Sequence, residues 1–373
     1  MNSLYIHIPF CAKKCLYCDF YSIGHDEKLA SKFIDILSAQ AMTLKIQFDT
    51  IYIGGGTPSV LESRLLEKLL KSLKAAACNV KEFTIEANPE SITAKKLKLF
   101  LNYGINRISI GVQSFDDKKL AKLGRIHSGQ KAIEAVNLAK HSGFKNISID
   151  LIFGVWQETL GAWKEELKAA MELPLKHISC YSLSYEKHAK LSALLKEKSI
   201  IPQSDEVTVK MYEHAIDYLG KNKFFHYEIS NFSKAGFQCK HNLNYWQNNS
   251  YVGLGPSAVS YREGKRAKNI SDGKKYIELA GKGKSTVVFN EKLSLEMQAK
   301  ETAAIKIRTT EGIDFDWFKK RTGFDFLKLE SDDIDFLIKQ RLLKYKKSRS
   351  KESGIALTRK GFLFCDSVSA QLL

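Results

Sequence analysis

The chain has 373 residues, 44% of them hydrophobic, and a formal net charge of +17 at neutral pH. This length suffices for two or three domains, and no apolar run is long enough to span a bilayer as a helix. We see no charged segment with a cleavage site near Met1, so we expect a cytoplasmic protein. The positive charge attracts anions of every kind and does not by itself identify a partner.

The first half of the chain alternates short β-rich runs with helix-patterned segments. This alternation is typical of repeated βα units that build a parallel sheet. The expected strands are 4–8, 50–53, 82–86, 107–110, 147–152 and 177–182, and the expected helices are 28–47, 62–76, 93–102, 130–141 and 159–171. Six such units predict an α/β fold with a partial (β/α)6 barrel of the TIM type, whose working residues lie at the C-terminal ends of the strands.

The second half of the chain is less regular. We expect a helix at 205–219, a short run at 224–229 and a polar and aromatic stretch at 231–261. Charged helices follow from about 294. The chain then ends with two runs, 342–345 and 355–361, and a polar turn at 350–354 between them. Helices followed by a small β-hairpin resemble a winged-helix module. We therefore expect a barrel at 1–200, a connecting segment at 201–290 and a C-terminal winged-helix-like α+β domain at 291–373.

Cys11, Cys15 and Cys18 form a C-x3-C-x2-C motif directly after the first expected strand. Three thiolates on a short loop can hold three irons of a [4Fe-4S] cluster and leave the fourth iron without a protein ligand. The amino and carboxylate groups of S-adenosylmethionine can chelate such an open iron. The alternative is a structural zinc site with His25 as fourth ligand. The scattered remaining cysteines suit a reducing compartment better than a disulfide framework.

The segment Tyr5-Ile6-His7-Ile8-Pro9-Phe10-Cys11, continuing to Cys18-Asp19-Phe20, resembles the radical-SAM family of oxygen-independent coproporphyrinogen III oxidase-like proteins. The resemblance covers essentially the whole chain and is strongest between residues 5 and 261. It implies a [4Fe-4S] cluster on the three cysteines of the motif and S-adenosylmethionine beside it. Two branches of the family are relevant, the decarboxylating HemN enzymes and the HemW heme chaperones.

The resemblance also assigns residues near the strand ends to S-adenosylmethionine: Gly55, Gly56, Thr57, Glu86, Gln113, Arg125 and Asp150, with Tyr5 and Tyr17 as further contacts. These residue types suit the ligand, because glycines permit close backbone approach and an arginine fork matches a carboxylate. A carboxylate such as that of Glu86 accepts hydrogen bonds from an ammonium group or a hydroxyl. A tight turn for the glycines, a structural hydrogen bond for Asp150 and simple packing for the two tyrosines are the alternatives.

The stretch from His241 to Trp246 carries the motif H-N-x-x-Y-W. A single histidine is most often a satisfied structural residue. This motif, however, resembles the hallmark of the HemW branch, where it is implicated in heme handling. Imidazole is a common axial ligand of heme iron, and flanking aromatic rings suit a flat macrocycle. The resemblance therefore makes His241 a candidate heme ligand.

Two features favour the HemW branch. Asp19 and Phe20 follow Cys18 where HemN has a fourth cysteine, and the chain lacks the long extension that HemN carries before its cluster loop. We expect a heme chaperone that binds heme and passes it to acceptor hemoproteins, with an electron donor as a further partner. The first alternative is an oxygen-independent coproporphyrinogen III oxidase that abstracts hydrogen from a propionate.

A nucleic-acid-modifying radical enzyme is the second alternative. It is disfavoured because the C-terminal region lacks an obvious aromatic and basic stacking platform. Whether the protein is a monomer or a dimer, and whether it contacts a membrane surface peripherally, stays open at this level.

Overall fold

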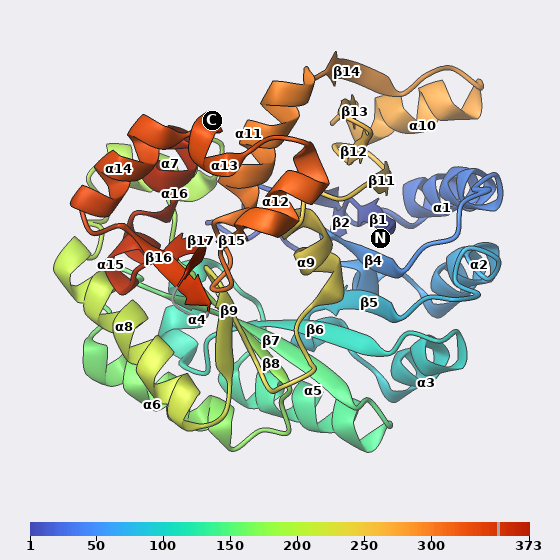
Figure 1. The fold of residues 1–373 in the computed structure, drawn as a ribbon. Coiled ribbons are helices and arrows are strands. Elements are labelled where there is room, and N and C mark those ends of the chain that lie inside the picture. The colour runs from blue at the N-terminus through green and yellow to red at the C-terminus, as the bar shows by residue number, and fades with distance from the viewer. Residues whose placement is uncertain (349–350) are drawn as a thin grey trace.

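The computed structural model describes residues 1–348 and 351–373. A 12-stranded sheet runs through most of the molecule (Figure 1), and its centre is a set of parallel strands in the order β1, β4, β5, β6, β7, β8. Their bounds are Ser3–Ile8 for β1, Thr50–Gly55 for β4, Glu82–Ala87 for β5, Arg107–Gln113 for β6, Asn146–Phe153 for β7 and His177–Ser182 for β8. The six predicted strands and their parallel arrangement are thus confirmed.

Helices cover the outer face of these strands, as Figure 1 shows. They are α1 (Glu27–Met42), α2 (Ser63–Ser72), α3 (Ala94–Asn102), α5 (Gly129–His141), α6 (Leu160–Met171) and α8 (Asp205–Lys221). The shorter α4 (Asp117–Leu123) and α7 (Lys190–Lys196) instead bond through their backbone to Leu16. Asp26, Thr93 and Ser128 each cap a helix by accepting a backbone N–H three residues on. The predicted helices are confirmed, except that α1 and α2 end several residues early and α7 was not predicted.

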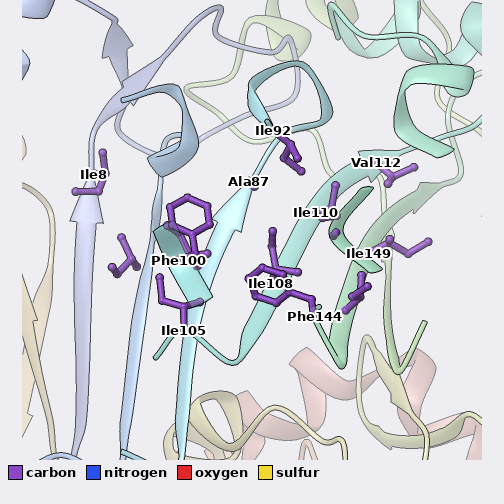
Figure 2. Packing of buried hydrophobic residues seen from close by; sticks show 14 of the residues in the cluster. Ile8, Ala87, Ile92, Phe100, Ile105, Ile108, Ile110, Val112, Phe144 and Ile149 are labelled. Atoms are coloured by element: carbon purple, nitrogen blue, oxygen red, sulfur yellow. The ribbon is translucent and has the colours of Figure 1, made fainter. Parts of the chain in front are cut away.

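The apolar side chains of the strands and of the covering helices form the main core. Figure 2 shows part of it, where Ile108 and Ile110 of β6 belong to the same buried cluster as Phe100 of α3 and Phe144. Burying a side chain of this size contributes roughly 1.5–3 kcal/mol relative to leaving it exposed. This packing holds the strand ends, and therefore the loops that follow them, in fixed positions.

The segment expected as a polar connection adds strands to both edges of the barrel sheet. β11 (Tyr251–Leu254) pairs in parallel with β1, and β12 (Val259–Arg262), β13 (Lys265–Asn269) and β14 (Val287–Lys292) continue antiparallel beyond it. β9 (Phe225–Glu228) and β10 (Asn231–Ser233) extend the opposite edge. Most of these strands were not predicted because they are only three to six residues long. Along the chain, the helix α9 (Lys240–Trp246) lies between β10 and β11, and the helix α10 (Gly273–Gly281) lies between β13 and β14.

The C-terminal part has its own apolar core, which includes Phe318, Phe326 and Ile355. Its elements are α11 (Leu295–Lys306), β15 (Ile313–Asp314), α12 (Phe315–Thr322), α13 (Phe326–Leu329), α14 (Ser331–Lys339), β16 (Leu343–Ser348), β17 (Lys351–Leu357), α15 (Arg359–Leu363) and α16 (Cys365–Gln371). Helices followed by a hairpin of β16 and β17 match the winged-helix-like expectation.

The turn expected at 350–354 is largely wrong, because β17 already begins at Lys351 and continues the ladder with β16. Residue 350, where that turn was expected to begin, lies outside the described residues. The division into segments 1–200, 201–290 and 291–373 stays a prediction. In the part of the chain that the structure describes, no helix combines the length and apolar character needed to cross a bilayer.

Candidate functional site

The cysteine loop leaves the sheet at the C-terminal end of β1. It begins in β2 (Phe10–Cys11), which pairs in parallel with β3 (Ile23–Gly24) where the loop returns. In its middle, the backbone N–H of Leu16 donates to the carbonyl of Leu123 at the end of α4 over 3.1 Å. The loop is therefore anchored at both ends and at its centre, which limits the positions that its thiols can adopt.

A cavity of about 570 Å³ lies at the C-terminal ends of the parallel strands. The predicted residues that line it are Cys11, Cys15, Tyr17, Cys18, Gly55, Gly56, Thr57, Glu86, Gln113, Arg125 and Asp150. The structure thus brings together every predicted site residue except Tyr5 and His241. This is the face at which a barrel of parallel strands places its working residues.

The glycine loop after β4 lies directly against the cysteine loop. Gly56 donates its backbone N–H to the Ile8 carbonyl over 2.8 Å, and Thr57 donates to the Phe10 carbonyl over 2.7 Å. A Cβ atom on Gly56 would stand 2.7 Å from the Phe10 carbonyl oxygen and 3.0 Å from the Cys11 sulfur. Glycine at this position is therefore required by the close approach of two backbones.

We expect Gly56→Ala to reduce cluster content and S-adenosylmethionine affinity strongly, because the added methyl group must push Cys11 and its loop outward. Gly161→Ala is the matched control, since its Cβ would meet nothing nearer than 3.7 Å. Iron and sulfide content after anaerobic reconstitution measures the effect. Equal cluster content in both variants would show that the close approach has no importance for the site.

Arg125 is held at the cavity wall by Asn88, which was not among the predicted site residues. Its Nη2 donates to Asn88 Oδ1 over 2.8 Å and to the Gly111 carbonyl over 2.7 Å, while Nη1 faces the Cys15 sulfur at 3.4 Å. Asn88 also donates to Thr57 Oγ1 over 3.0 Å. Asn88 comes directly after β5, two residues beyond Glu86. Its position at the C-terminal end of a parallel strand could have identified it as a site residue. Asn88 therefore positions two groups that line the cavity, the Arg125 guanidinium and the Thr57 hydroxyl.

Two partly buried carboxyl groups lie on the cavity wall. Burial, together with the nearby charge of Asp150, raises the pKa of Glu86 to about 7, although Glu86 accepts hydrogen bonds from the Tyr52 hydroxyl at 2.7 Å and the Gly55 N–H at 3.1 Å. Burial likewise raises the pKa of Asp150, opposed by the Ser179 hydroxyl and the charge of Arg107. A cationic ligand in the cavity would stabilise the ionised form of both carboxyl groups.

Gln113 ends β6 with an unusual backbone conformation. Its φ is +65°, in the left-handed region that non-glycine residues rarely adopt, and the pairing of β6 with β7 shifts register between Ile110 and Gln113. Such an irregularity redirects a side chain and is common beside functional sites. Here it brings Gln113 to the cavity.

The three thiols fit a cluster better than a single ion. Burial raises the pKa of Cys11 and, to about 11, that of Cys18, so a bound cation is needed to hold them as thiolates. Among the described residues, no three His, Cys, Asp or Glu side chains surround one metal-sized point. A [4Fe-4S] cluster does not require this, because each sulfur binds a different iron. His25, the fourth ligand in the zinc alternative, packs edge-on against Phe10 and does not line the cavity.

Tyr5 lies below the cavity rather than on its wall. Its hydroxyl is 3.1 Å from His7 Nδ1, and its ring lies beside the Tyr52 ring at a centroid distance of 6.3 Å. The packing alternative for Tyr5 describes this arrangement better than direct ligand contact.

His241 lies at the opposite end of the barrel, in α9, with 1% of its surface exposed. Its Nδ1 is 2.9 Å from the hydroxyl of Thr50, the first residue of β4, and its Nε2 is 3.1 Å from the Tyr245 hydroxyl. Burial lowers its pKa to about 3, so the ring is neutral. Since both ring nitrogens already have partners, iron ligation would require Tyr245 or Thr50 to move away. This conformation does not support His241 as an axial ligand.

Comparison with known proteins agrees with this geometry. The Radical SAM superfamily matches residues 5–170. The heme chaperone HemW of Lactococcus lactis is 36% identical over 100% of this chain and 97% of that protein, and that of Bacillus subtilis is 34% identical over 100% and 99%.

Among solved structures, the coproporphyrinogen III oxidase HemN of Escherichia coli, a radical SAM enzyme, shares the fold. The TM-score is 0.84 at 21% identity, and the match covers 100% of this chain and 89% of that one. Radical SAM proteins hold a [4Fe-4S] cluster and S-adenosylmethionine, and the residues gathered in the cavity suit both. The chain belongs to the HemW family of the radical SAM superfamily.

Proposed function

We propose that this protein is a heme chaperone that binds heme and transfers it to acceptor hemoproteins. The observation that carries the proposal is the full-length similarity to proteins named as heme chaperones, from the first strand to the last helix. The cavity supports it, because it gathers the three cysteines of the motif with most of the residues that the resemblance assigns to S-adenosylmethionine. Seven free thiols suit a reducing, cytoplasmic location.

Within this proposal, Cys11, Cys15 and Cys18 bind the cluster and leave one iron for S-adenosylmethionine. A bound cluster, once reduced by the expected electron donor, would supply the electron that cleaves the sulfonium of S-adenosylmethionine. Glu86 and Asp150 place negative charge where the cationic part of S-adenosylmethionine would bind. Arg125 lies beside Cys15, where its guanidinium can bind the carboxylate of the same ligand. Tyr17, in the cluster loop, is partly buried and helps to exclude water.

Heme transfer tests the proposal directly. Heme-loaded, anaerobically reconstituted protein is mixed with a heme-depleted b-type hemoprotein, and the recovery of that protein's spectrum and activity is followed after separation. We expect recovery to depend on the loaded chaperone and to exceed recovery with the same concentration of free heme. Recovery equal to that with free heme would contradict a chaperone function.

The oxidase alternative is tested in parallel. The HemN fold favours it, and the same cavity residues would serve it. Anaerobic incubation with coproporphyrinogen III, S-adenosylmethionine and a reductant should give no decarboxylated product at enzymatic turnover. Product at such a rate would replace the chaperone assignment with the oxidase.

The affinity for S-adenosylmethionine should rise with pH. With a pKa of about 7, Glu86 is mostly neutral at pH 6 and mostly ionised at pH 8, and only the ionised form attracts a cation. We expect about a tenfold gain between these values. The same raised pKa means that the contribution of Glu86 to folding stability is lost as the pH rises through 7. Equilibrium dialysis measures the affinity; Glu86→Gln should remove this gain and leave only the ligand's own titration, and an unchanged slope would exclude Glu86.

A further inference from the structure

A buried histidine lies directly behind the cavity wall, two residues after Arg125. The side chain of His127 has no exposed surface, and His127 is not among the described residues that line the cavity. Its Nε2 donates to the Val112 carbonyl over 3.0 Å, and its Nδ1 faces Glu90 Oε2 at 3.3 Å. The imidazole therefore connects the end of β6 with the turn that follows β5.

The neighbours of the His127 ring favour a proton on both of its nitrogens. A carbonyl oxygen can only accept a hydrogen bond, and the same holds for an ionised carboxylate. Burial alone would raise the pKa of Glu90, but the contact with His127 and the charge of Arg125 outweigh it and leave that pKa below its ordinary value. A neutral imidazole would turn a bare nitrogen toward one of the two oxygens. The imidazolium can donate toward both, so it is the form that fits this site.

The Val112 carbonyl also closes the strained turn at Gln113. It accepts the backbone N–H of Ser114 over 2.8 Å, so a hydrogen bond between residues two apart encloses Gln113, whose φ is +65°. A turn this tight with a positive φ is rare and strained, and it persists only where the surroundings hold it. The N–H of His127 at the same carbonyl is one such restraint.

The turn after β5 holds the Arg125 segment at two points. Asn88 Oδ1 accepts from Arg125 Nη2 over 2.8 Å, and Glu90 faces His127. The short helix η2 (Pro89–Ser91), which carries Glu90, packs against α5 and β6. An amide therefore holds one end of the segment, and a charged pair holds the other.

The groups that depend on these contacts meet at one point of the cavity wall. A Cβ atom on Gly111 would stand 3.0 Å from Gln113 Nε2 and 3.5 Å from Arg125 Nη2. The amide and the guanidinium therefore lie close together, and both line the cavity. Each can donate hydrogen bonds to a carboxylate, so together they can bind the same group of a ligand.

We propose that His127 is a positioning residue for S-adenosylmethionine, which holds Gln113 and Arg125 where they receive the carboxylate of that ligand. The carboxylate of Glu90 stabilises the charged ring, and the charged ring restrains the strand end, so His127 and Glu90 act as a pair. The inference rests on the carboxylate-binding role proposed for Arg125 and extends it to a buried residue that does not touch the ligand.

The affinity of full-length, anaerobically reconstituted protein for S-adenosylmethionine tests this role. The test variant is His127→Gln, and Glu90→Gln is a second variant that keeps the side-chain shape and removes only the charge. His177→Gln is the matched control, because His177 is equally buried and its nitrogens lie 2.8 Å from the Ser148 hydroxyl and 2.7 Å from the Tyr227 hydroxyl. His177 begins β8, at the end of the sheet away from the cavity. Affinity is compared per bound cluster.

We expect His127→Gln to bind S-adenosylmethionine about tenfold more weakly, Glu90→Gln to show a smaller loss, and the control to be unchanged. Arg125→Met should lose at least as much affinity as His127→Gln. S-adenosylhomocysteine, which keeps the carboxylate, should also bind His127→Gln more weakly, whereas 5′-methylthioadenosine, which lacks it, should bind the variant and the unaltered protein equally.

Nitrogen-15 NMR of labelled histidine gives a readout that a merely structural role would not change. At neutral pH the His127 ring should carry protons on both nitrogens in the unaltered protein and on one nitrogen in Glu90→Gln. His127→Gln identifies the signals by their loss. This measurement does not depend on the ligand, so it decides the charged pair even if a variant folds poorly.

Three results would overturn the role of His127 and leave that of Arg125 intact. They are unchanged affinity in His127→Gln while Arg125→Met binds weakly, equal losses in His127→Gln and His177→Gln, and a singly protonated His127 ring in the unaltered protein. Unchanged affinity in Arg125→Met would instead contradict the carboxylate-binding role of Arg125, and the positioning role with it.

Discussion

Replacement of Cys15 by alanine should reduce the iron and sulfide of the anaerobically reconstituted protein to near background. The thiol lies on the cavity wall beside Arg125, and each cysteine of the motif is needed for a separate iron. Cys11→Ala and Cys18→Ala should behave in the same way, because two protein ligands leave half of the cluster unanchored. The loss of the visible absorption of the cluster provides a second readout.

Cys78→Ala is the control for this series, since Cys78 is exposed and far from the cavity lining. It should retain full iron and sulfide content. Zinc at one equivalent in place of iron, or unchanged iron in the Cys15 variant, would contradict the cluster assignment. Either result would also remove the basis for S-adenosylmethionine binding.

Lys119→Met should lower the free energy of unfolding by about 3–5 kcal/mol. Lys119 is buried, with its Nζ 2.5 Å from Glu158 and 4.0 Å from Glu166, and its charge lies over the Trp163 ring. Both carboxylates are buried as well, with 4% and 5% of their side chains exposed. The substitution keeps most of the side-chain volume but leaves two buried negative charges without their cation, which is the costly part.

Lys68→Met is the matched control, because Lys68 pairs with Asp35 at 2.6 Å while both side chains are 53% exposed. In solvent such a pair contributes at most about 1 kcal/mol. Urea unfolding followed by circular dichroism compares the two variants. If they lose the same stability, the buried pair contributes no more than an exposed one.

Much of the barrel could be predicted from the sequence because its strands are buried on both faces and read as apolar runs between helical patterns. The same reasoning placed Glu86 and Gln113 at one end of the sheet, since parallel strands direct their C-terminal ends the same way. Asn88 was missed because its role depends on where Arg125 reaches, and that requires the three-dimensional arrangement.

The strands β11 to β14 were missed for a different reason. These strands are only four to six residues long and do not alternate between buried and exposed positions, so the sequence has no strong periodic signal there. The pairing of β11 with β1 depends on backbone hydrogen bonds that no side-chain pattern encodes. His241 shows the same limit at a single residue. Its motif indicated a family, yet only the folded chain shows that the imidazole is enclosed by Thr50 and Tyr245.

The amino-acid sequence by itself therefore determined the three-cysteine motif and the six parallel strands, because ligand spacing and hydrophobic periodicity are local properties. The family was indicated by the resemblance of whole motifs, such as the segment from Tyr5 to Phe20, and not by periodicity. The tertiary structure alone decided which of the motif residues meet at one cavity and which stay buried elsewhere. The reason is physical: contacts between residues far apart in sequence, such as Arg125 with Asn88 and Cys15, exist only after packing has placed their strands and loops side by side.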